Sequence, residues 1–100
     1  MGKVRLEVSP ELAGVLDAEG SDWVILEKED SEWAAIGDLL TDLASGHSDF
    51  RKEVYDPFTG RVGDGVLIVL NGSLLQPADV AEVKLKEGDI VLLLPVFAGG

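Results

Sequence analysis

The residues best suited to chemistry in this sequence stand at its C-terminal end, in the stretch PVFAGG from Pro95 to Gly100. Glycine carries no Cβ, so Gly99 and Gly100 can pass through a channel too narrow for any other residue. The group delivered through such a channel is the terminal carboxylate of Gly100. An ionised carboxylate resists nucleophilic attack, and conversion to an acyl-adenylate would supply a leaving group. That step needs a partner protein that holds ATP and Mg²⁺.

The residues before the two glycines suit contact with such a partner. Pro95 removes a backbone donor and fixes φ, which predicts the end of a strand. From Pro95 the chain can extend up to about 20 Å at roughly 3.3 Å per residue. Val96 and Phe97 are large apolar groups on this segment, and Ala98 joins them to the glycines. We therefore expect Val96 and Phe97 to be buried in a partner's groove. The alternative is a disordered end that contains two glycines by chance.

No other group of residues predicts a catalytic or metal site. His47 is the only histidine and the sequence has no cysteine, so a metal or thiol site lacks a second ligand. Histidines just past a helix end often interact with the negative end of its dipole. The acidic cluster Glu27, Glu29, Asp30 and Glu32 matches no Ca²⁺ loop. The phosphate-binding and dinucleotide-binding glycine motifs are absent. We expect no metal or cofactor on this chain, and no catalysis by the chain alone.

Composition bears on partners and location. Nineteen acidic residues against eight basic ones give a formal net charge of −11. Nucleic-acid binding is not expected, because phosphate contacts need clustered Lys and Arg. The charge suits either a basic protein partner or solubility alone. The longest apolar runs are short and no basic, apolar leader opens the sequence, so neither secretion nor membrane spanning is expected. The lack of cysteine fits a reducing compartment, and we expect a cytoplasmic protein.

A single domain must position the C-terminal residues, since the chain has 100 residues. Lys3–Val8 alternates polar and apolar residues and predicts a half-buried strand. Trp23–Glu29 predicts a second strand after a hairpin connection. An amphipathic helix follows, with Asp30 or Ser31 as its N-cap and Gly46 in the left-handed position at its C-terminal end. Its apolar stripe is Trp33, Ile36, Leu40, Leu43 and Ala44. Both tryptophans fit these apolar patterns and are expected in the core.

The second half of the sequence predicts further strands. The polar stretch from residue 47 to 64 predicts a packed loop with a helical turn near Phe50. Val66–Leu70 predicts a buried strand that ends in a tight turn at Asn71-Gly72, and a short helical turn can begin at Pro77. Ile90–Leu94 is apolar on both faces, as expected of a strand in the middle of a sheet. One helix and a mixed sheet make a two-layer α+β domain, which we place at residues 1–94, with a flexible tail at 95–100.

The stretch GVLIVLNGSLL, followed by VKLKEGDIVLLLPVFAGG, resembles the C-terminal half of the MoaD/ThiS small sulfur carriers, which are ubiquitin-like β-grasp proteins. The shared features are a buried strand ending in Asn71-Gly72, a turn from Leu85 to Asp89, another buried strand, Pro95 and the final glycine pair. The order of elements from Lys3 to Gly46 fits as well. The resemblance therefore implies a β-grasp fold, with a mixed sheet of four to five strands packed on one main helix.

The resemblance also implies a function. An E1-like enzyme, which holds ATP and Mg²⁺, would adenylate Gly100, and the terminus would become a thiocarboxylate that donates sulfur. The loop before Gly65 is more similar to the molybdopterin synthase small subunits than to the thiamin carriers. Molybdenum cofactor biosynthesis is therefore the expected pathway, with the tail inserted into the synthase large subunit. Phe97 differs from the smaller residue that these carriers commonly have before Ala-Gly-Gly. The alternative pathways are sulfur transfer for thiamin, tRNA thiolation or cysteine synthesis.

Two other classes of function fit the same sequence. In ubiquitin-related and small archaeal modifiers, the activated terminal glycine forms an isopeptide bond with a lysine. That chemistry and sulfur transfer share the activation step and differ only in the nucleophile, so the sequence does not separate them. The remaining class is a non-catalytic β-grasp interaction module, which a dispensable tail would favour.

Overall fold

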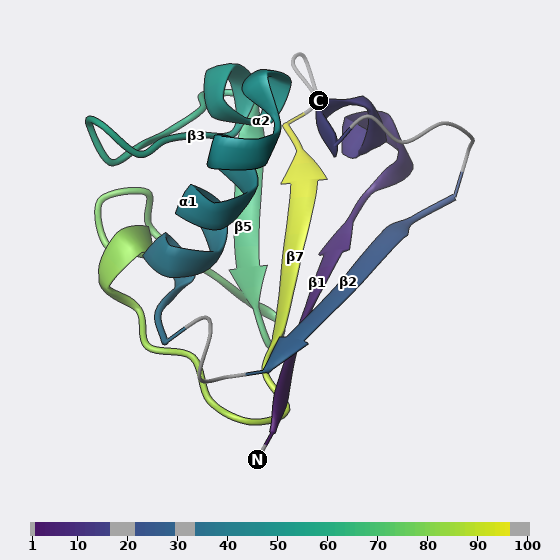
Figure 1. The fold of residues 1–100 in the computed structure, drawn as a ribbon, viewed down its shortest axis with the longest axis vertical. Coiled ribbons are helices and arrows are strands. Elements are labelled where there is room, and N and C mark those ends of the chain that lie inside the picture. The colour runs from purple at the N-terminus through teal and green to yellow at the C-terminus, as the bar shows by residue number, and fades with distance from the viewer. Residues whose placement is uncertain (1, 17–21, 30–33, 97–100) are drawn as a thin grey trace.

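The computed structural model describes residues 2–16, 22–29 and 34–96, and Figure 1 shows one large sheet with its helices gathered on one face. Among these residues, five strands form the sheet in the order β2-β1-β7-β5-β6. They are β1 (Lys3–Val8), β2 (Val24–Glu29), β5 (Val66–Leu70), β6 (Ser73–Leu74) and β7 (Ile90–Pro95). β1 and β7 pair in parallel, and the other neighbours pair antiparallel. This mixed sheet and its helix layer confirm the α+β, β-grasp prediction.

The main helix, α1 (Ile36–Gly46), begins later than the sequence predicted. Its N-cap is Ala35, and the carboxylate of Asp38 accepts a hydrogen bond of 3.0 Å from the Ala35 N–H. The Ile36 N–H donates to the Val83 carbonyl at 2.9 Å, so a contact distant in sequence fixes the first turn. The predicted cap at Asp30 or Ser31 is therefore wrong, although both residues lie outside the described ranges. The left-handed conformation predicted for Gly46 is wrong as well, because Gly46 is the last helical residue of α1 and His47, in an extended conformation, is its C-cap.

The core lies between α1 and the sheet. β1 contributes every second residue to this core, as predicted, and β5 and β7 contribute Ile68, Val91 and Leu93. The stripe of α1 is confirmed from Ile36 onward, and Trp33 lies outside the described residues. The prediction for Trp23 is wrong, because its side chain is 44% exposed. Trp23 precedes β2, which is the edge strand of the sheet, so no neighbouring strand covers it.

The remaining elements surround this core. The helical turn predicted near Phe50 is present as α2 (Ser48–Glu53), and η1 (Pro10–Leu16) occupies the connection after β1. The second predicted helical turn, η2 (Val80–Glu82), begins after the N-cap Asp79 and not at Pro77. A small two-stranded sheet was not predicted; it consists of β3 (Tyr55–Asp56) and β4 (Arg61–Val62). No helix in the described ranges is long and apolar enough to cross a membrane.

The carboxylate of Asp89 accepts hydrogen bonds from two turns at the end of the sheet where β7 begins. This buried carboxylate accepts hydrogen bonds from the Asn71 side-chain amide at 2.9 Å and from the Lys86 N–H at 2.8 Å. Asn71 in turn accepts from the Ile90 N–H at 2.9 Å. Asn71 and Gly72 have φ values of 50° and 86°, as a two-residue hairpin turn with the primed geometry requires. The network fixes the end of β5 relative to the start of β7.

Replacing Asp89 with alanine should leave the Asn71 amide and the Lys86 N–H without their acceptor. We expect the free energy of unfolding to fall by about 3–6 kcal/mol, since two hydrogen bonds are lost and hydrogen bonds to charged groups are worth about 1.5–3 kcal/mol each. Urea denaturation measures the change. Asp89→Asn keeps one acceptor oxygen and should lose less. If the alanine variant is as stable as the parent, the carboxylate does not have this role.

Replacing Gly63 with alanine should strain the contact between α2 and β4. The Gly63 N–H donates to the Val54 carbonyl at 2.7 Å, and a Cβ at Gly63 would collide with the Glu53 carbonyl oxygen. We expect a loss of about 1–3 kcal/mol, the usual cost of forcing extra atoms into a packed site. Gly46→Ala is the control, because a Cβ there meets nothing within 4 Å. Equal thermal stability of the two variants would contradict this account.

Candidate functional site

β7 carries the chain toward the C-terminal residues. Pro95 lies opposite Val66, and the Val96 N–H donates to the Gly65 carbonyl at 2.9 Å, which continues the β5–β7 ladder beyond the strand. In an antiparallel pair, the backbone N–H and C=O groups of successive residues point alternately toward the partner strand and away from it. Because the Val96 N–H points toward β5, the backbone nitrogen of Pro95 points away from β5. Proline is therefore tolerated at this position. The last strand includes Pro95, one residue beyond the end predicted from the sequence.

Of the six predicted tail residues, the structure describes Pro95 and Val96. The Val96 side chain is 45% exposed, which suits the predicted contact with a partner. Phe97, Ala98, Gly99 and Gly100 lie outside the described residues. Their roles therefore stay predictions, and so does the division between a domain at 1–94 and a tail at 95–100.

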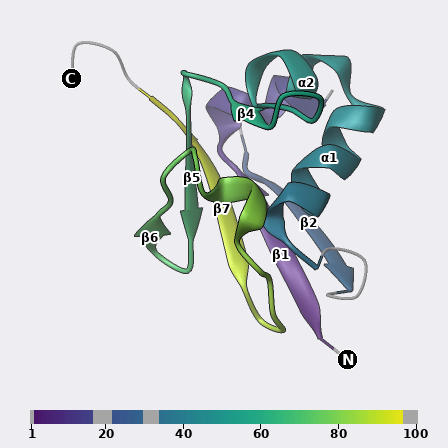
Figure 2. The ribbon, with the colours of Figure 1, turned by 90° about the vertical axis from the view of Figure 1, so that its left-hand side faces the viewer.

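The face of the sheet opposite α1 has no helix over it in either ribbon view (Figures 1 and 2). Strand register places one row of side chains across this face, from Ile25 through Glu7, Leu92 and Val69 to Leu74. Leu94 and Leu67 form the next pair toward Val96. We name as the outer apolar face the residues Ile25, Leu67, Val69, Leu74, Ile90, Leu92 and Leu94. Uncovered apolar surface of this kind marks sites of protein contact.

The charged side chains of this face lie on β1 and β2, away from the tail. Arg5 contacts Glu27 at 3.3 Å and Glu7 at 3.7 Å. The Arg5 and Glu27 side chains are about half exposed, so this pairing contributes little to stability. The part of the face on β5, β6 and β7 is apolar and leads to Val96. A partner that engages the tail would therefore meet apolar surface first.

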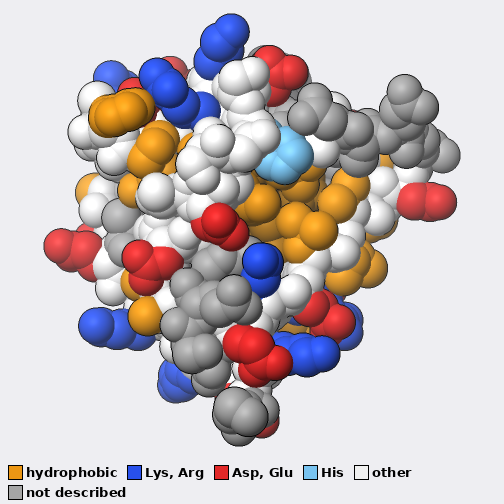
Figure 3. Space-filling view, in the orientation of Figure 1, with side chains coloured by type: hydrophobic (Ala, Val, Ile, Leu, Met, Phe, Trp, Pro, Cys, Tyr) orange, Lys and Arg blue, Asp and Glu red, His pale blue; other side chains and the backbone are white. Residues whose placement is uncertain are grey.

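A charged and aromatic group lies at the end of the molecule that carries α2. The guanidinium of Arg51 lies 4.9 Å from the ring centre of Phe58, whose side chain is 79% exposed. Lys52 and Arg61 line the same surface hollow as Arg51, and so do Asp56 and Asp64. Figure 3 shows blue and red side chains close together at this end. The group is therefore of mixed charge.

The other candidates from the sequence are His47 and the acidic cluster around β2. In the described ranges no cluster of three or more His, Cys, Asp or Glu residues could hold a metal ion. His47 is the C-cap of α1, and its backbone N–H donates to the Leu43 carbonyl at 3.0 Å. Glu27 and Glu29 both lie on β2, while Asp30 and Glu32 lie outside the described residues.

Sequence reasoning missed the outer apolar face for a specific reason. The sequence predicts a buried strand for the run of β5 and, for the run of β7, a strand that is apolar on both faces in the middle of a sheet. β7 is indeed in the middle of the sheet, with Val91 and Leu93 fully buried against the helix layer. On the other side of the strand, Ile90 remains 36% exposed. An apolar run on both faces therefore signals either a second covering layer or a contact surface.

The ThiS family model matches residues 18–100 of the chain, whereas no curated protein sequence matches it. Three solved structures are similar in fold. Small archaeal modifier protein 1 from Methanosarcina acetivorans has a TM-score of 0.66 at 18% identity, with 100% of this chain and 98% of that chain covered. Putative molybdopterin converting factor subunit 1 from Pyrococcus furiosus has a TM-score of 0.62 at 23% identity, with 97% of this chain and 100% of that chain covered. A chain of the Amycolatopsis orientalis BexX/CysO complex has a TM-score of 0.67 at 20% identity, with 97% of this chain and 99% of that chain covered.

Proposed function

The chain belongs to the ThiS family, and we propose that it is a small sulfur carrier whose Gly100 is activated by an E1-like enzyme and converted to a thiocarboxylate. The observation that carries this proposal is the family match, which runs through Gly99 and Gly100. The ladder from β5 to Val96 supports it, because it holds the chain firmly up to the root of the proposed tail.

The proposed chemistry uses a main-chain group of this chain and no side chain. A carboxylate oxygen of Gly100 attacks the α-phosphorus of ATP on the activating enzyme, and pyrophosphate leaves. A sulfur nucleophile at the hydrosulfide level then attacks the carbonyl carbon, and AMP leaves with the bonding electrons. The product is a thiocarboxylate at Gly100. ATP, Mg²⁺ and sulfur come from partner proteins, and this chain supplies the carboxylate and its position.

We further propose molybdenum cofactor biosynthesis as the pathway, in the cytoplasm, with the molybdopterin synthase large subunit as the partner that receives the tail. The fold similarity to a putative molybdopterin converting factor subunit 1 favours this choice. So does the resemblance of the loop before Gly65 to that of the molybdopterin synthase small subunits. Sulfur transfer for thiamin, tRNA thiolation or cysteine synthesis is the alternative within the same chemistry.

The second candidate function is a protein modifier that forms an isopeptide bond through Gly100. The fold similarity to a small archaeal modifier protein favours it. Intact mass of the protein from its native host, together with a blot for larger conjugates, separates the two. Sulfur in place of a terminal oxygen, without conjugates, supports the carrier. Conjugates that leave Gly-Gly on lysines would replace it with the modifier.

Adding one alanine after Gly100 should abolish activation and leave the fold intact. The added Cβ would block a channel that admits only glycine, and the reactive carboxylate would be displaced by one residue. ATP–pyrophosphate exchange with the activating enzyme measures the effect, and circular dichroism checks the fold. One alanine added before Met1 is the control. Adenylation of the extended chain at its own terminus would refute the channel argument.

Replacing Leu94 with glutamate should weaken docking of the activating enzyme on the outer apolar face. A charge in the apolar part of the face must be desolvated on docking, and we expect KM to rise about tenfold or more with kcat unchanged. Ile25→Glu is the control, since Ile25 is 54% exposed and lies on the β2 edge, two strands from β7 and separated from it by the charged side chains of β1. Equal effects of the two substitutions would contradict docking beside the tail.

A further inference from the structure

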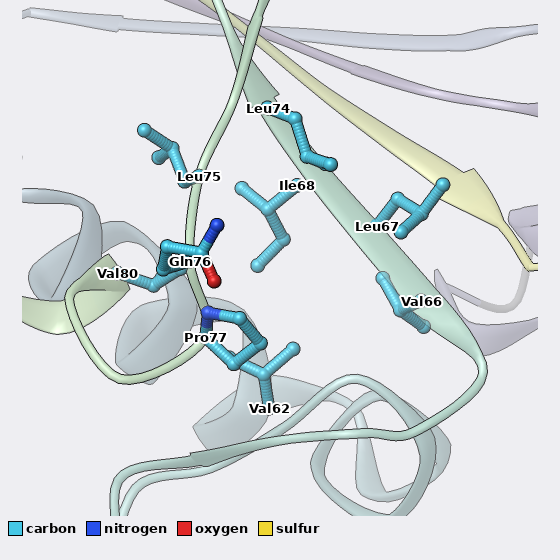
Figure 4. A pocket seen from close by; sticks show the side chains of 9 residues that line it. All are labelled: Val62, Val66, Leu67, Ile68, Leu74, Leu75, Gln76, Pro77 and Val80. Atoms are coloured by element: carbon cyan, nitrogen blue, oxygen red, sulfur yellow. The ribbon is translucent and has the colours of Figure 1, made fainter.

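A small apolar hollow lies beside the outer edge of β5 (Figure 4). Its volume is about 80 Å³, enough for a few water molecules or one residue of an extended chain. Its lining is aliphatic apart from one glutamine, and consists of Val62, Val66, Leu67, Ile68, Leu74, Leu75, Gln76, Pro77 and Val80. In Figure 4, the chain that carries Gln76 and Pro77 runs beside β5 at a distance from it.

The hollow exists because β6 stops pairing with β5. Leu70 lies opposite Ser73 and Val69 opposite Leu74, and the Leu75 N–H donates to the Ile68 carbonyl at 2.9 Å. Two residues further, the same register would place Pro77 opposite Val66. Proline has no N–H and cannot extend a ladder, so the chain turns away toward η2. The sequence itself therefore leaves the edge of β5 open at this point.

Two backbone groups of β5 remain unpaired on this edge. In the described part of the chain, neither the Ile68 N–H nor the Val66 carbonyl has a hydrogen-bond partner. Ile68 is 1% exposed and Val66 is 7% exposed. An unpaired backbone group in such surroundings costs as much as a lost hydrogen bond, so both groups favour an occupant that can pair with them.

The two groups have the spacing of a parallel β-bridge. In such a bridge, one incoming residue opposite Leu67 donates its N–H to the Val66 carbonyl and accepts from the Ile68 N–H. An antiparallel partner fits less well, because the Ile68 carbonyl already accepts from Leu75 and the Val66 N–H donates to Gly63 at 3.3 Å. The incoming side chain would lie on the same side as Leu67 and Leu74, on the outer apolar face.

We propose that this edge of β5 binds an extended, uncharged aliphatic segment of a partner protein, which joins the sheet as a parallel strand. A second surface hollow shares Val62, Val66, Leu67 and Pro77 with the first and reaches Val96. The bound segment would therefore lie next to the root of the tail. The partner that supplies this segment is the enzyme that takes up the tail. Only this choice of partner rests on the proposed function.

The test uses the full ¹⁵N-labelled chain and the capped peptide acetyl-Ala-Val-Ile-Val-Ala-amide as probe. We expect the Ile68 amide signal to shift saturably and its hydrogen exchange to slow about tenfold, as one new hydrogen bond would give. The Leu70 amide, which faces Ser73 in the β5–β6 hairpin, is the internal control and should not change. The same peptide with its central isoleucine N-methylated cannot donate to Val66 and should lose the effect.

A variant tests the role of the proline. Pro77→Val supplies an N–H opposite Val66, so β6 can close the edge itself, and the peptide should bind at least tenfold more weakly. Pro57→Val, in the β3–β4 turn, controls for loss of a proline.

The proposal is overturned if both peptides act alike, or if shifts appear only on the outer apolar face. Protection of Ile68 that rises with protein concentration alone would indicate a second copy as occupant and would also overturn it. Thiolation of Gly100 is read separately by mass, so either proposal can fail without the other.

Discussion

The carboxylate of Asp89 holds two turns in one position, and the placement of β7 depends on it. By bonding Asn71 and the turn at Lys86, it fixes the end of β5 against the start of β7. A slip of one residue in that pairing would exchange the two faces of the strand. Leu92 and Leu94 would then enter the core, and Val91 and Leu93 would face outward. The same network therefore determines which side chains of β7 enter the core, which belong to the outer apolar face, and where Val96 lies.

Val66 lies between two prolines, and this arrangement explains why the functional features gather at one end of the sheet. On one side Val66 faces Pro95 in β7, and on the other the register of β6 would bring Pro77 opposite it. Neither proline offers an N–H to the ladder. Pro95 does not interrupt the pairing of β5 with β7, because the Val96 N–H continues that ladder to the Gly65 carbonyl. At Pro77 the pairing of β6 with β5 ends, which leaves the edge of β5 open near Val96.

The proposed activity places unusual demands on the protein. Its reactive group is a main-chain carboxylate, so the domain need not preorganise a catalytic side chain, and it must instead present a tail and a surface that partners recognise. Apolar side chains left open on β5, β6 and β7 suit that purpose, because they lead directly to Val96. Leaving them uncovered sacrifices part of the stability that burial would provide. A contact surface beside the tail gives a physical reason for that arrangement.

The sequence by itself determined the strand at Lys3–Val8, the apolar face of α1 from Ile36 onward and the hairpin turn at Asn71-Gly72, because each depends on local periodicity or on local φ preferences. Tertiary structure decided that α1 begins at Ile36, since Val83 supplies the acceptor for its first N–H. It also decided that Trp23 is exposed and that β7 faces solvent on one side. Local patterning shows which side of a strand is apolar. Whether another layer covers that side depends on how distant segments pack, and no local pattern carries that information.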